Sequence, residues 1–506
     1  MTMTIRLRPL FTLLTCVVLL SALLSAQGPL LTSSPTSAYA SAGFTIAPTA
    51  GLSGTSATFS FDNGNGCDLN PCPVYYVMWD AVASSFPHTP AGPTLCSMAG
   101  QATPLTCSGV IPSAVPGTHT VYLLMCVTTT RTTCSTADST TFTVLPPPYN
   151  GPGGGIPWHA RYTARFSAGV DAQVDLADGH ADVQARDLAL PARGPALALA
   201  HVWDSARAAA GVSTVAGQGW QTNLTPRLDG AITGTVTYLD ASGATWPFTT
   251  TGSQGGVYGY TTPPGLPWQL VASTAGYTLT NILTGATQRF DGQGALRAAA
   301  DADGNSNTMT AGPFGPTSAV NSGGRTLAFT YTTTYPSGLL SETASPLWGQ
   351  GGASAAGSQH VTYGYNGLQL TALTQGAGTP DAVTTTFGYS GTQLTRVTTA
   401  ANRVWTLGYD GQGRVSTLTS PVSGTAGQPG YTSAYTTQFT YSPGQTQVVV
   451  GAGTSGALTT TYTLDAQGEA VATTDVLGRR SSRAYDADHN VTSRTDATGN
   501  QAHTHF

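Results

Sequence analysis

From residue 231 onward, apolar and polar residues alternate in short runs separated by turns rich in Asp and Gly. Trp405, Leu407 and Tyr409 lie two positions apart, so they share one face of a strand. The Asp that follows can accept hydrogen bonds from the backbone ahead of it, and a Gly three residues later supplies the positive φ that closes a turn. This pattern predicts β-hairpins with loops of about three to five residues.

The same unit recurs along the chain from residue 290 to residue 499. It begins with an aromatic or apolar residue followed by Asp, and it ends with Gly and a short alternating strand. The residues that define it are Phe290, Asp291 and Gly294; Tyr409, Asp410, Gly413 and Arg414; Leu464, Asp465 and Gly468; Tyr485 and Asp486; and Asp496 and Gly499. Because an isolated hairpin is barely stable in water, we expect these units to stack side by side.

The repeated units resemble the Rhs, or YD-repeat, family of bacterial secreted proteins. A second resemblance lies at 165–230, where an Asp-Leu-Ala-Leu-Pro-Ala-Arg-Gly run at 187–194 precedes an alternating strand at 197–203. Gly217-Gln218-Gly219-Trp220 and a second strand follow, in the order that precedes the repeats in this family. The chain departs from the family at 201–205, where an Arg-Thr-Tyr-Asn-Ser type of run is more usual.

Within this pre-repeat region, residues 165–230, three further expectations concern single side chains. We expect Trp203 and Trp220 to pack as a cap over the first hairpins. His201 alternates with apolar residues, which predicts a half-buried ring, and 205–210 is the one segment that favours a short helix.

The resemblance implies an all-β fold in which residues 231–506 form a stacked hairpin array that is part of a spiral β-shell. In the longest members of the family, a C-terminal region is released as a toxin. After Asn500 the family pattern would continue with another strand. We therefore expect either a truncated gene or a downstream Rhs or toxin polypeptide that completes the shell.

Residues 1–40 are predicted to be a signal peptide. Arg6 and Arg8 precede an apolar run from Leu10 to Leu24, which is short for a membrane span. Cleavage is expected after Ala40 or Ala26; a lipoprotein at Cys16 and an uncleaved anchor are the alternatives. The signal predicts a secreted or cell-surface protein whose contact with membrane is limited to this segment.

Residues 41–145 are predicted to form an immunoglobulin-like β-sandwich, with strands at 57–61, 74–79, 117–127 and 139–145. All cysteines outside the signal fall here, which indicates disulfides rather than zinc because metal-ligand spacings are absent. We favour sequential pairing among fifteen possible patterns: Cys67 with Cys72, Cys96 with Cys107, and Cys126 with Cys134. A Pro- and Gly-rich segment at 146–164 is predicted to be a linker.

The amino-acid composition excludes several classes of function. All 19 basic residues are Arg, so chemistry that requires a lysine amine is excluded, and the net charge of −5 gives no footprint for nucleic acid. The Asp-rich turns at 301–307 and 486–490 lack the full calcium-loop spacing, and His503 and His505 have no adjacent acidic or Cys partner. We expect no catalytic, cofactor or metal residues.

The first functional hypothesis is an exported, non-enzymatic Rhs-type scaffold for surface interaction or toxin encapsulation. The second is a cell-surface adhesin whose tyrosine rows bind glycans. A secreted hydrolase is a weaker third hypothesis.

Overall fold

The computed structural model describes residues 43–51, 55–62, 73–80, 92–99, 104–112, 114, 117–126, 134–144, 154–345, 359–422 and 433–504. The predicted signal peptide and the first part of the predicted linker lie outside these ranges. Among the described residues, no helix combines the length and the apolar character needed to cross a membrane.

The N-terminal described region consists of two sheets whose facing side chains form one core. Their strands are β1 Phe44–Ala47, β2 Ala50–Gly51, β3 Ser56–Phe61, β4 Val74–Trp79, β5 Thr94–Met98, β6 Leu105–Val110, β7 Gly117–Cys126 and β8 Cys134–Val144. The sheets have the orders β1-β3-β6 and β2-β8-β7-β4-β5. Phe59 and Trp79, one from each sheet, are fully buried in the shared core. The region is thus a β-sandwich, and its immunoglobulin-like character stays a prediction.

One predicted disulfide is present between Cys96 and Cys107. Cys126 is also disulfide-bonded, and its backbone lies opposite Cys134 in the β7–β8 ladder. The side chain of Cys134 lies outside the described part of the chain, as do Cys67 and Cys72.

The pre-repeat region forms a five-stranded antiparallel sheet with the order β15-β12-β11-β10-β9. Its elements are β9 Arg161–Arg165, β10 Val170–Asp175, β11 Ala181–Leu190, β12 Leu197–Asp204, α1 Ser205–Ala209, β13 Ser213–Thr214, β14 Gly217–Gln218 and β15 Trp220–Thr222. The predicted helix is present, one residue shorter than expected. Its N-cap is Asp204, whose carboxylate accepts a hydrogen bond from the Arg207 N–H.

The linker predicted over 146–164 is wrong in its second half. Strand β9 begins at Arg161, and Ile156 and Trp158 pack against the main core. Burial of these two apolar side chains stabilises an ordered path that the Gly and Pro content of the segment conceals.

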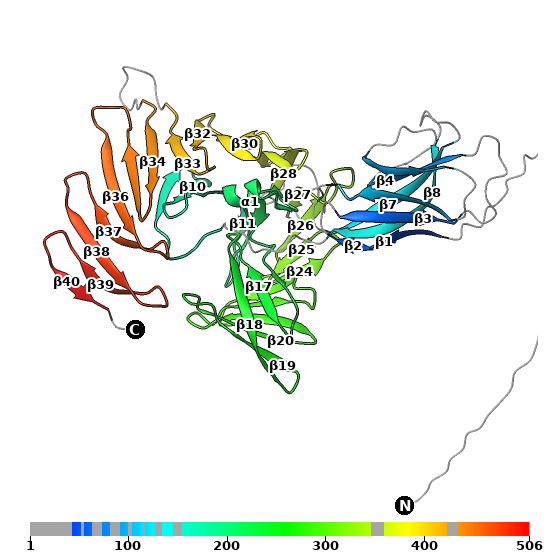
Figure 1. Cartoon of the computed structure of the whole chain (residues 1–506), viewed down its shortest axis with the longest axis horizontal. Helices are drawn as coiled ribbons and strands as arrows, with labels where there is room; N and C mark the ends of the chain where they lie inside the picture. Colours follow the sequence, from blue (N-terminus) through cyan, green and yellow to red (C-terminus); the bar gives the residue numbers. More distant parts are fainter. Residues whose placement is uncertain are drawn as a thin grey trace, which may run out of the picture. The chain divides into compact units, whose positions relative to one another are not determined.

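The repeat array is one antiparallel sheet of 25 strands in which each strand pairs with its neighbours in sequence (Figure 1), and one isolated bridge also joins Arg227 of β16 to Ala295. The strands are β16 Arg227–Asp229, β17 Thr235–Leu239, β18 Thr245–Gln254, β19 Val257–Thr261, β20 Trp268–Ser273, β21 Gly276–Asn281, β22 Thr287–Phe290, β23 Leu296–Ala300, β24 Ser306–Ala311, β25 Pro316–Asn321, β26 Thr326–Tyr331, β27 Leu340–Ala344, β28 His360–Asn366, β29 Gln369–Gln375, β30 Val383–Ser390, β31 Gln393–Thr398, β32 Val404–Tyr409, β33 Val415–Thr419, β34 Thr436–Ser442, β35 Gln445–Val450, β36 Leu458–Leu464, β37 Ala470–Thr474, β38 Arg480–Tyr485, β39 Val491–Thr495 and β40 Gln501–His503. The predicted all-β array is confirmed, and it begins at Arg227 rather than at 231.

The apolar face of the array packs against the pre-repeat sheet in a single core. In β32, Trp405 and Leu407 are buried whereas Thr406 is exposed, as period-two alternation predicts. The pre-repeat region and the segment just before it contact hairpins that lie far apart in sequence: Ala196 bonds to Asn307 in β24, and Trp158 stacks on His489 after β38. Since one compact sheet touches so many successive strands, the array must curve around it.

The two faces of β32 should respond differently to truncation. We expect Leu407→Ala to destabilise the protein by about 2–5 kcal/mol because it leaves a cavity under the pre-repeat sheet. Thr406→Ala, one residue away on the exposed face, should change stability by less than about 0.5 kcal/mol. Chemical denaturation followed by tryptophan fluorescence measures both. Equal effects of the two substitutions would contradict the assigned orientation of the strand.

Candidate functional site

The predicted Asp-Gly turns are built around one carboxylate. Asp410 Oδ1 accepts hydrogen bonds from the Gln412 and Arg414 N–H groups, at 2.9 and 3.0 Å. The Arg414 guanidinium donates to Asp410 Oδ2, and Gly413 closes the turn with φ +79°. Burial pushes the pKa of Asp410 upward, but the hydrogen bonds from Arg414 and Gln412 outweigh it and lower that pKa.

The other predicted turn residues occupy the same geometry. Asp291, Asp465, Asp486 and Asp496 each accept two backbone N–H bonds, from the residues two and four positions ahead. Gly294, Gly468 and Gly499 have positive φ, and His489 takes the equivalent position after Asp486 with φ +64°. Phe290 and Leu464 are buried at the preceding strand ends.

The turn at Asp301, weighed above as a calcium loop, belongs to the same type. Its Oδ1 accepts from the backbone N–H groups of Asp303 and Asn305, and its Oδ2 accepts from the Asn305 side chain. Both carboxylate oxygens therefore serve the turn.

In six hairpins of the array, a tyrosine at or near the end of the first strand bonds to the preceding hairpin. The pairs, with O···O distances of 2.7 to 3.2 Å, are Tyr331 with Pro316, Tyr365 with Leu340, Tyr389 with Leu370, Tyr409 with Leu394, Tyr441 with Val415 and Tyr485 with Ala470, the hydroxyl donating to the backbone carbonyl each time. In each case the ladder between the two hairpins ends two residues further from the turn, for example at Arg396 rather than Leu394. The hydroxyl satisfies a carbonyl that the ladder does not reach.

Burial raises the pKa of Tyr365, Tyr389, Tyr409 and Tyr441. These hydroxyls therefore stay protonated at neutral pH and can donate the bonds described above.

The pre-repeat sheet contacts the array through aromatic pairs. Phe166 stacks on Trp405 at 4.5 Å between ring centroids, and Tyr162 meets Phe439 edge-on at 5.3 Å. Trp220 is fully buried and donates from Nε1 to the Tyr389 hydroxyl at 2.8 Å. Trp220 thus covers a hairpin in the middle of the array, and the expectation that it covers the first hairpins is wrong.

His201 belongs to a buried polar cluster. Its Nδ1 lies 2.7 Å from Asp187 Oδ2, and the Tyr363 hydroxyl donates to the same oxygen at 2.7 Å. His201 is fully buried rather than half-buried, because the Tyr363 ring in β28 of the array packs against it at 4.8 Å between ring centroids.

A second polar cluster lies at the loop between β10 and β11, residues 176–180, which we call the docking loop. The Val415 N–H donates to the Gly179 carbonyl at 2.9 Å, and Thr446 Oγ1 donates to the Leu176 carbonyl at 2.6 Å. Gly179 has φ +78°, and a Cβ there would lie 2.6 Å from the Arg414 Cβ. This close approach requires glycine and joins the loop to an Asp-Gly turn of the array.

The acidic and histidine side chains of this cluster gather around His180. His180 Nδ1 lies 2.6 Å from Asp178 Oδ1, while its Nε2 lies 3.8 Å from both Asp182 Oδ2 and Asp204 Oδ2. On the other side, His159 Nδ1 lies 2.8 Å from Asp175.

Two pKa values in the cluster are shifted. Burial raises the pKa of Asp204 to about 6, and the nearby Asp182 carboxylate adds to the effect. Burial lowers the pKa of His180, but the bond to Asp178 and the charges of Asp182 and Asp204 outweigh it and raise that pKa well above its usual value.

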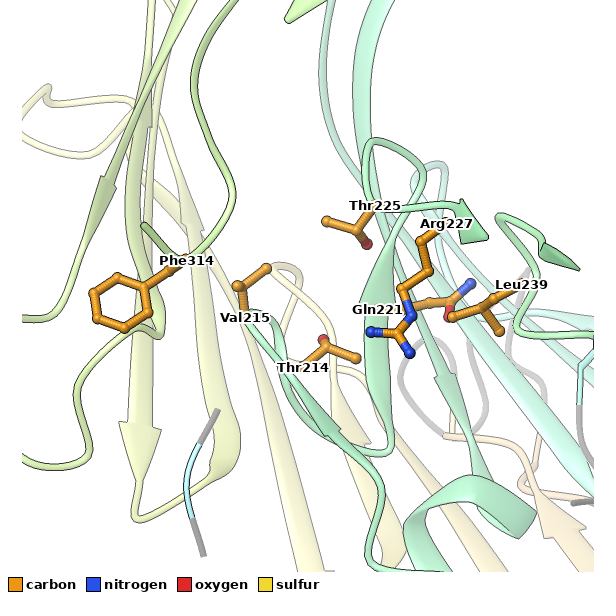
Figure 2. A pocket seen from close by; sticks show the side chains of 7 residues that line it. All are labelled: Thr214, Val215, Gln221, Thr225, Arg227, Leu239 and Phe314. Atoms are coloured by element: carbon orange, nitrogen blue, oxygen red, sulfur yellow. The ribbon is translucent and has the colours of Figure 1, made fainter. Parts of the chain in front are cut away.

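A cavity of about 570 Å³ adjoins the cluster. Its lining includes Asp178 and His180 from the docking loop, α1, and the turns at 390–393 and 412–414. A smaller cavity of about 90 Å³, shown in Figure 2, lies where Val215 and Phe314 meet the side chains of Gln221 and Arg227.

The docking-loop cluster is not among the sites predicted from the sequence. Asp175, Asp178, His180 and Asp182 fall within eight residues, which is a local signal of polar chemistry. Asp204 is 22 residues beyond Asp182, and only the β11–β12 pairing, which places these two residues opposite each other, reveals that it belongs.

An array of sequence-adjacent hairpins that curves around a pre-repeat sheet defines a hairpin-repeat protein. The family model RHS Repeat matches residues 389–425 and 465–501. The model of a domain of unknown function, DUF6531, matches 171–248, which is most of the pre-repeat region. These matches confirm the predicted resemblance of the repeat array to the RHS-repeat family.

No curated protein matches the chain. Among solved structures, "Crystal Structure of TcdB2-TccC3" is 12% identical over 65% of this chain and 24% of that one, with a TM-score of 0.20. "Crystal Structure of TcdB2-TccC3-TEV" is 10% identical over 82% of this chain and 25% of that one, with a TM-score of 0.25. A DUF4784 family protein from Bacteroides caccae is 11% identical over 86% of this chain and 95% of that one, with a TM-score of 0.13. The chain thus spans about a quarter of the TcdB2-TccC3 structures.

The tyrosine hydroxyls should contribute measurably to stability. We expect Tyr409→Phe to cost about 1 kcal/mol because it leaves the Leu394 carbonyl without its donor. Tyr435→Phe is the control, since Tyr435 is 37% exposed and its hydroxyl has no hydrogen bond to the described residues. The free energy of unfolding from urea titration decides; a cost for Tyr409→Phe no larger than for the control would contradict the role of the hydroxyl.

Two substitutions at Asp410 should separate the turn bonds from the ion pair. Asp410→Ala loses both and should cost about 1–2 kcal/mol. Asp410→Asn keeps an oxygen acceptor, as Asn321 naturally does at its own turn, and should cost only a few tenths of a kcal/mol.

The same pair carries a pH prediction. The folded pKa of Asp410 is lowered, so its contribution is complete above the unfolded pKa and is lost as pH falls through the folded pKa. Thermal melting between neutral and acidic pH should therefore show a smaller acid-induced loss for Asp410→Asn than for the wild type. Identical pH profiles of the two proteins would contradict this assignment.

Proposed function

We propose that this RHS-repeat protein is an exported, non-enzymatic scaffold whose array forms part of a shell around a further polypeptide, and that this polypeptide presents acidic groups to the inner face of the last hairpins. The support comes from how the residues on that face change along the array.

The inner face of each hairpin carries a directly opposed pair of side chains. The pairs in five successive hairpins are Tyr363 with Leu373, Phe387 with Val397, Leu407 with Leu418, Phe439 with Val448 and Tyr462 with Thr473. All but the last are buried at both positions in the core shared with the pre-repeat sheet. These hairpins therefore have their covering partner within the chain.

The hairpin β38–β39 breaks this pattern. At the equivalent positions Arg483 faces Arg494, and both side chains are exposed. Like charges directly opposed across a ladder are destabilising unless another group compensates them. Within the described residues neither guanidinium has an ion-pair partner, so a partner with carboxylates on its surface fits this face. This pair is the observation that carries the proposal.

The hairpin itself is fully formed. The Tyr485 hydroxyl bonds to the Ala470 carbonyl, and Asp486 accepts its turn bonds. Figure 1 shows β38 to β40 continuing the run of neighbouring strands. An ordered backbone with an uncovered, basic inner face is what a shell wall that contacts its contents requires.

The glycan-binding hypothesis gains nothing from this geometry. The tyrosine rows that suggested it hold their hydroxyls against carbonyls of the preceding hairpins, as Tyr389 and Tyr409 do. Glycan binding and hydrolase activity stay untested predictions.

Co-expression with the polypeptide encoded immediately downstream tests the proposal. We expect the two chains to co-purify, and the downstream polypeptide to resist protease in the complex but not alone. Arg483→Glu with Arg494→Glu should weaken binding at least about tenfold and reduce its salt dependence.

Arg480→Glu is the matched control, because Arg480 lies on the same strand but on the opposite face and is also exposed. It makes the same charge change as Arg483→Glu or Arg494→Glu alone and should leave binding intact, whereas each of those single substitutions should weaken it. Failure to co-purify, or equal loss in the control and in the double variant, would overturn the proposal.

A further inference from the structure

We propose that His180, Asp182 and Asp204 form a binding site for one divalent transition-metal ion, such as Zn²⁺, which fastens the docking loop to the pre-repeat sheet. The three side chains come from the end of the loop, from β11 and from the end of β12, and all three are buried. This inference is independent of the proposed scaffold function.

The donor atoms converge. His180 Nε2 lies 3.8 Å from the Oδ2 atoms of both Asp182 and Asp204, and the three donors lie within 4.8 Å of one another. Donors of a tetrahedral zinc site are roughly 3.4 Å apart, given bonds of about 2.0–2.2 Å. Small movements of these side chains would bring them to that spacing. One imidazole and two carboxylates suit a first-row transition metal better than calcium, which takes only oxygen ligands.

The imidazole is aimed at the two carboxylates without bonding to either. His180 is 6% exposed, and its Nε2 has no hydrogen-bond partner among the described residues. Asp182 Oδ1 is equally without one in that part of the chain. Buried polar atoms are normally satisfied, so this pair of unsatisfied atoms in one cluster calls for a further ligand.

The surrounding groups have the arrangement found around metal ligands. Asp178 Oδ1 lies 2.6 Å from His180 Nδ1, which fixes the ring and leaves Nε2 free to coordinate. Arg161 donates to Asp182 Oδ2 at 2.9 Å, and the Gly154 N–H donates to Asp204 Oδ2. These bonds orient the two carboxylates while each keeps lone pairs for a cation.

The position of the docking loop gives an ion access to the cluster and determines what ion binding would stabilise. Asp178 and His180 line the cavity of about 570 Å³, which gives an ion a path to the cluster. The loop also carries Gly179, whose carbonyl accepts from the Val415 N–H of the array. An ion bound here would stabilise the loop and, through it, the contact between the pre-repeat sheet and the array.

Metal titration of the full chain tests the site. Protein purified in chelator and then freed of it should bind one equivalent of Zn²⁺ by calorimetry, with Mn²⁺ and Ca²⁺ compared in parallel. The melting temperature should rise with zinc and fall again with chelator. His180→Gln should abolish this binding, and Asp178→Asn, which removes only the orienting charge, should weaken it about 10- to 100-fold.

Two controls separate the cluster from other histidines. His201 is also buried, with Asp187 at its Nδ1, but it belongs to no group of metal-ligating side chains in the described residues, so His201→Gln should keep the zinc affinity. A His503→Gln, His505→Gln variant removes the terminal pair and should also bind normally. Absence of saturable zinc binding by the wild type would overturn the proposal, as would unchanged affinity in both His180→Gln and Asp178→Asn. In that case the cluster would be a protonated imidazole held between carboxylates.

Discussion

The array depends on a hydrogen bond that joins one hairpin to the next. Each of the six hairpins that accept a tyrosine hydroxyl has a bulge beside its turn, such as the one at Ser416 between Val415 and Thr417, and its ladder to the following hairpin ends two residues early. The carbonyl group at that position is left without a backbone donor, and an unsatisfied carbonyl in a half-buried position would destabilise the fold. The tyrosine of the following hairpin supplies its hydroxyl to that carbonyl, as Tyr441 does for Val415. Each repeat therefore contains both a tyrosine, which bonds to the preceding hairpin, and a bulge, whose carbonyl accepts from the tyrosine of the next hairpin.

The same bond also helps to fix register. A slip of one residue would move the tyrosine to the outer face and turn every buried residue of the strand outward. With Tyr409 bonded to Leu394, Trp405 and Leu407 must face the pre-repeat sheet. Local turn chemistry thereby decides which face of a 25-stranded sheet is apolar, although no single hairpin could hold that arrangement alone.

The sequence predicted what is local and repeated. The Asp410 turn, the alternation at Trp405 and Leu407, and the short helix after Asp204 follow from neighbouring residues, and the structure contains all three. The errors concern contacts between distant segments. The burial of His201 depends on Tyr363, the partner of Trp220 is Tyr389, and the order of the segment after Gly154 depends on a core that its Pro and Gly content does not reveal. Asp204 joins His180 only through strand pairing, so no spacing rule could have placed it in the cluster.

A repeated hairpin has no intrinsic end and no intrinsic curvature, so both must come from what the array packs against. The pre-repeat region and the residues just before it provide this because they meet different hairpins: Trp220 meets β30, Phe166 meets β32, Tyr162 meets β34 and Trp158 reaches the turn after β36. Beyond these contacts the inner face changes from buried apolar pairs to the opposed arginines of β38 and β39. The apolar face therefore extends as far as the chain's own core covers it, and the exposed, opposed arginines lie where that cover ends.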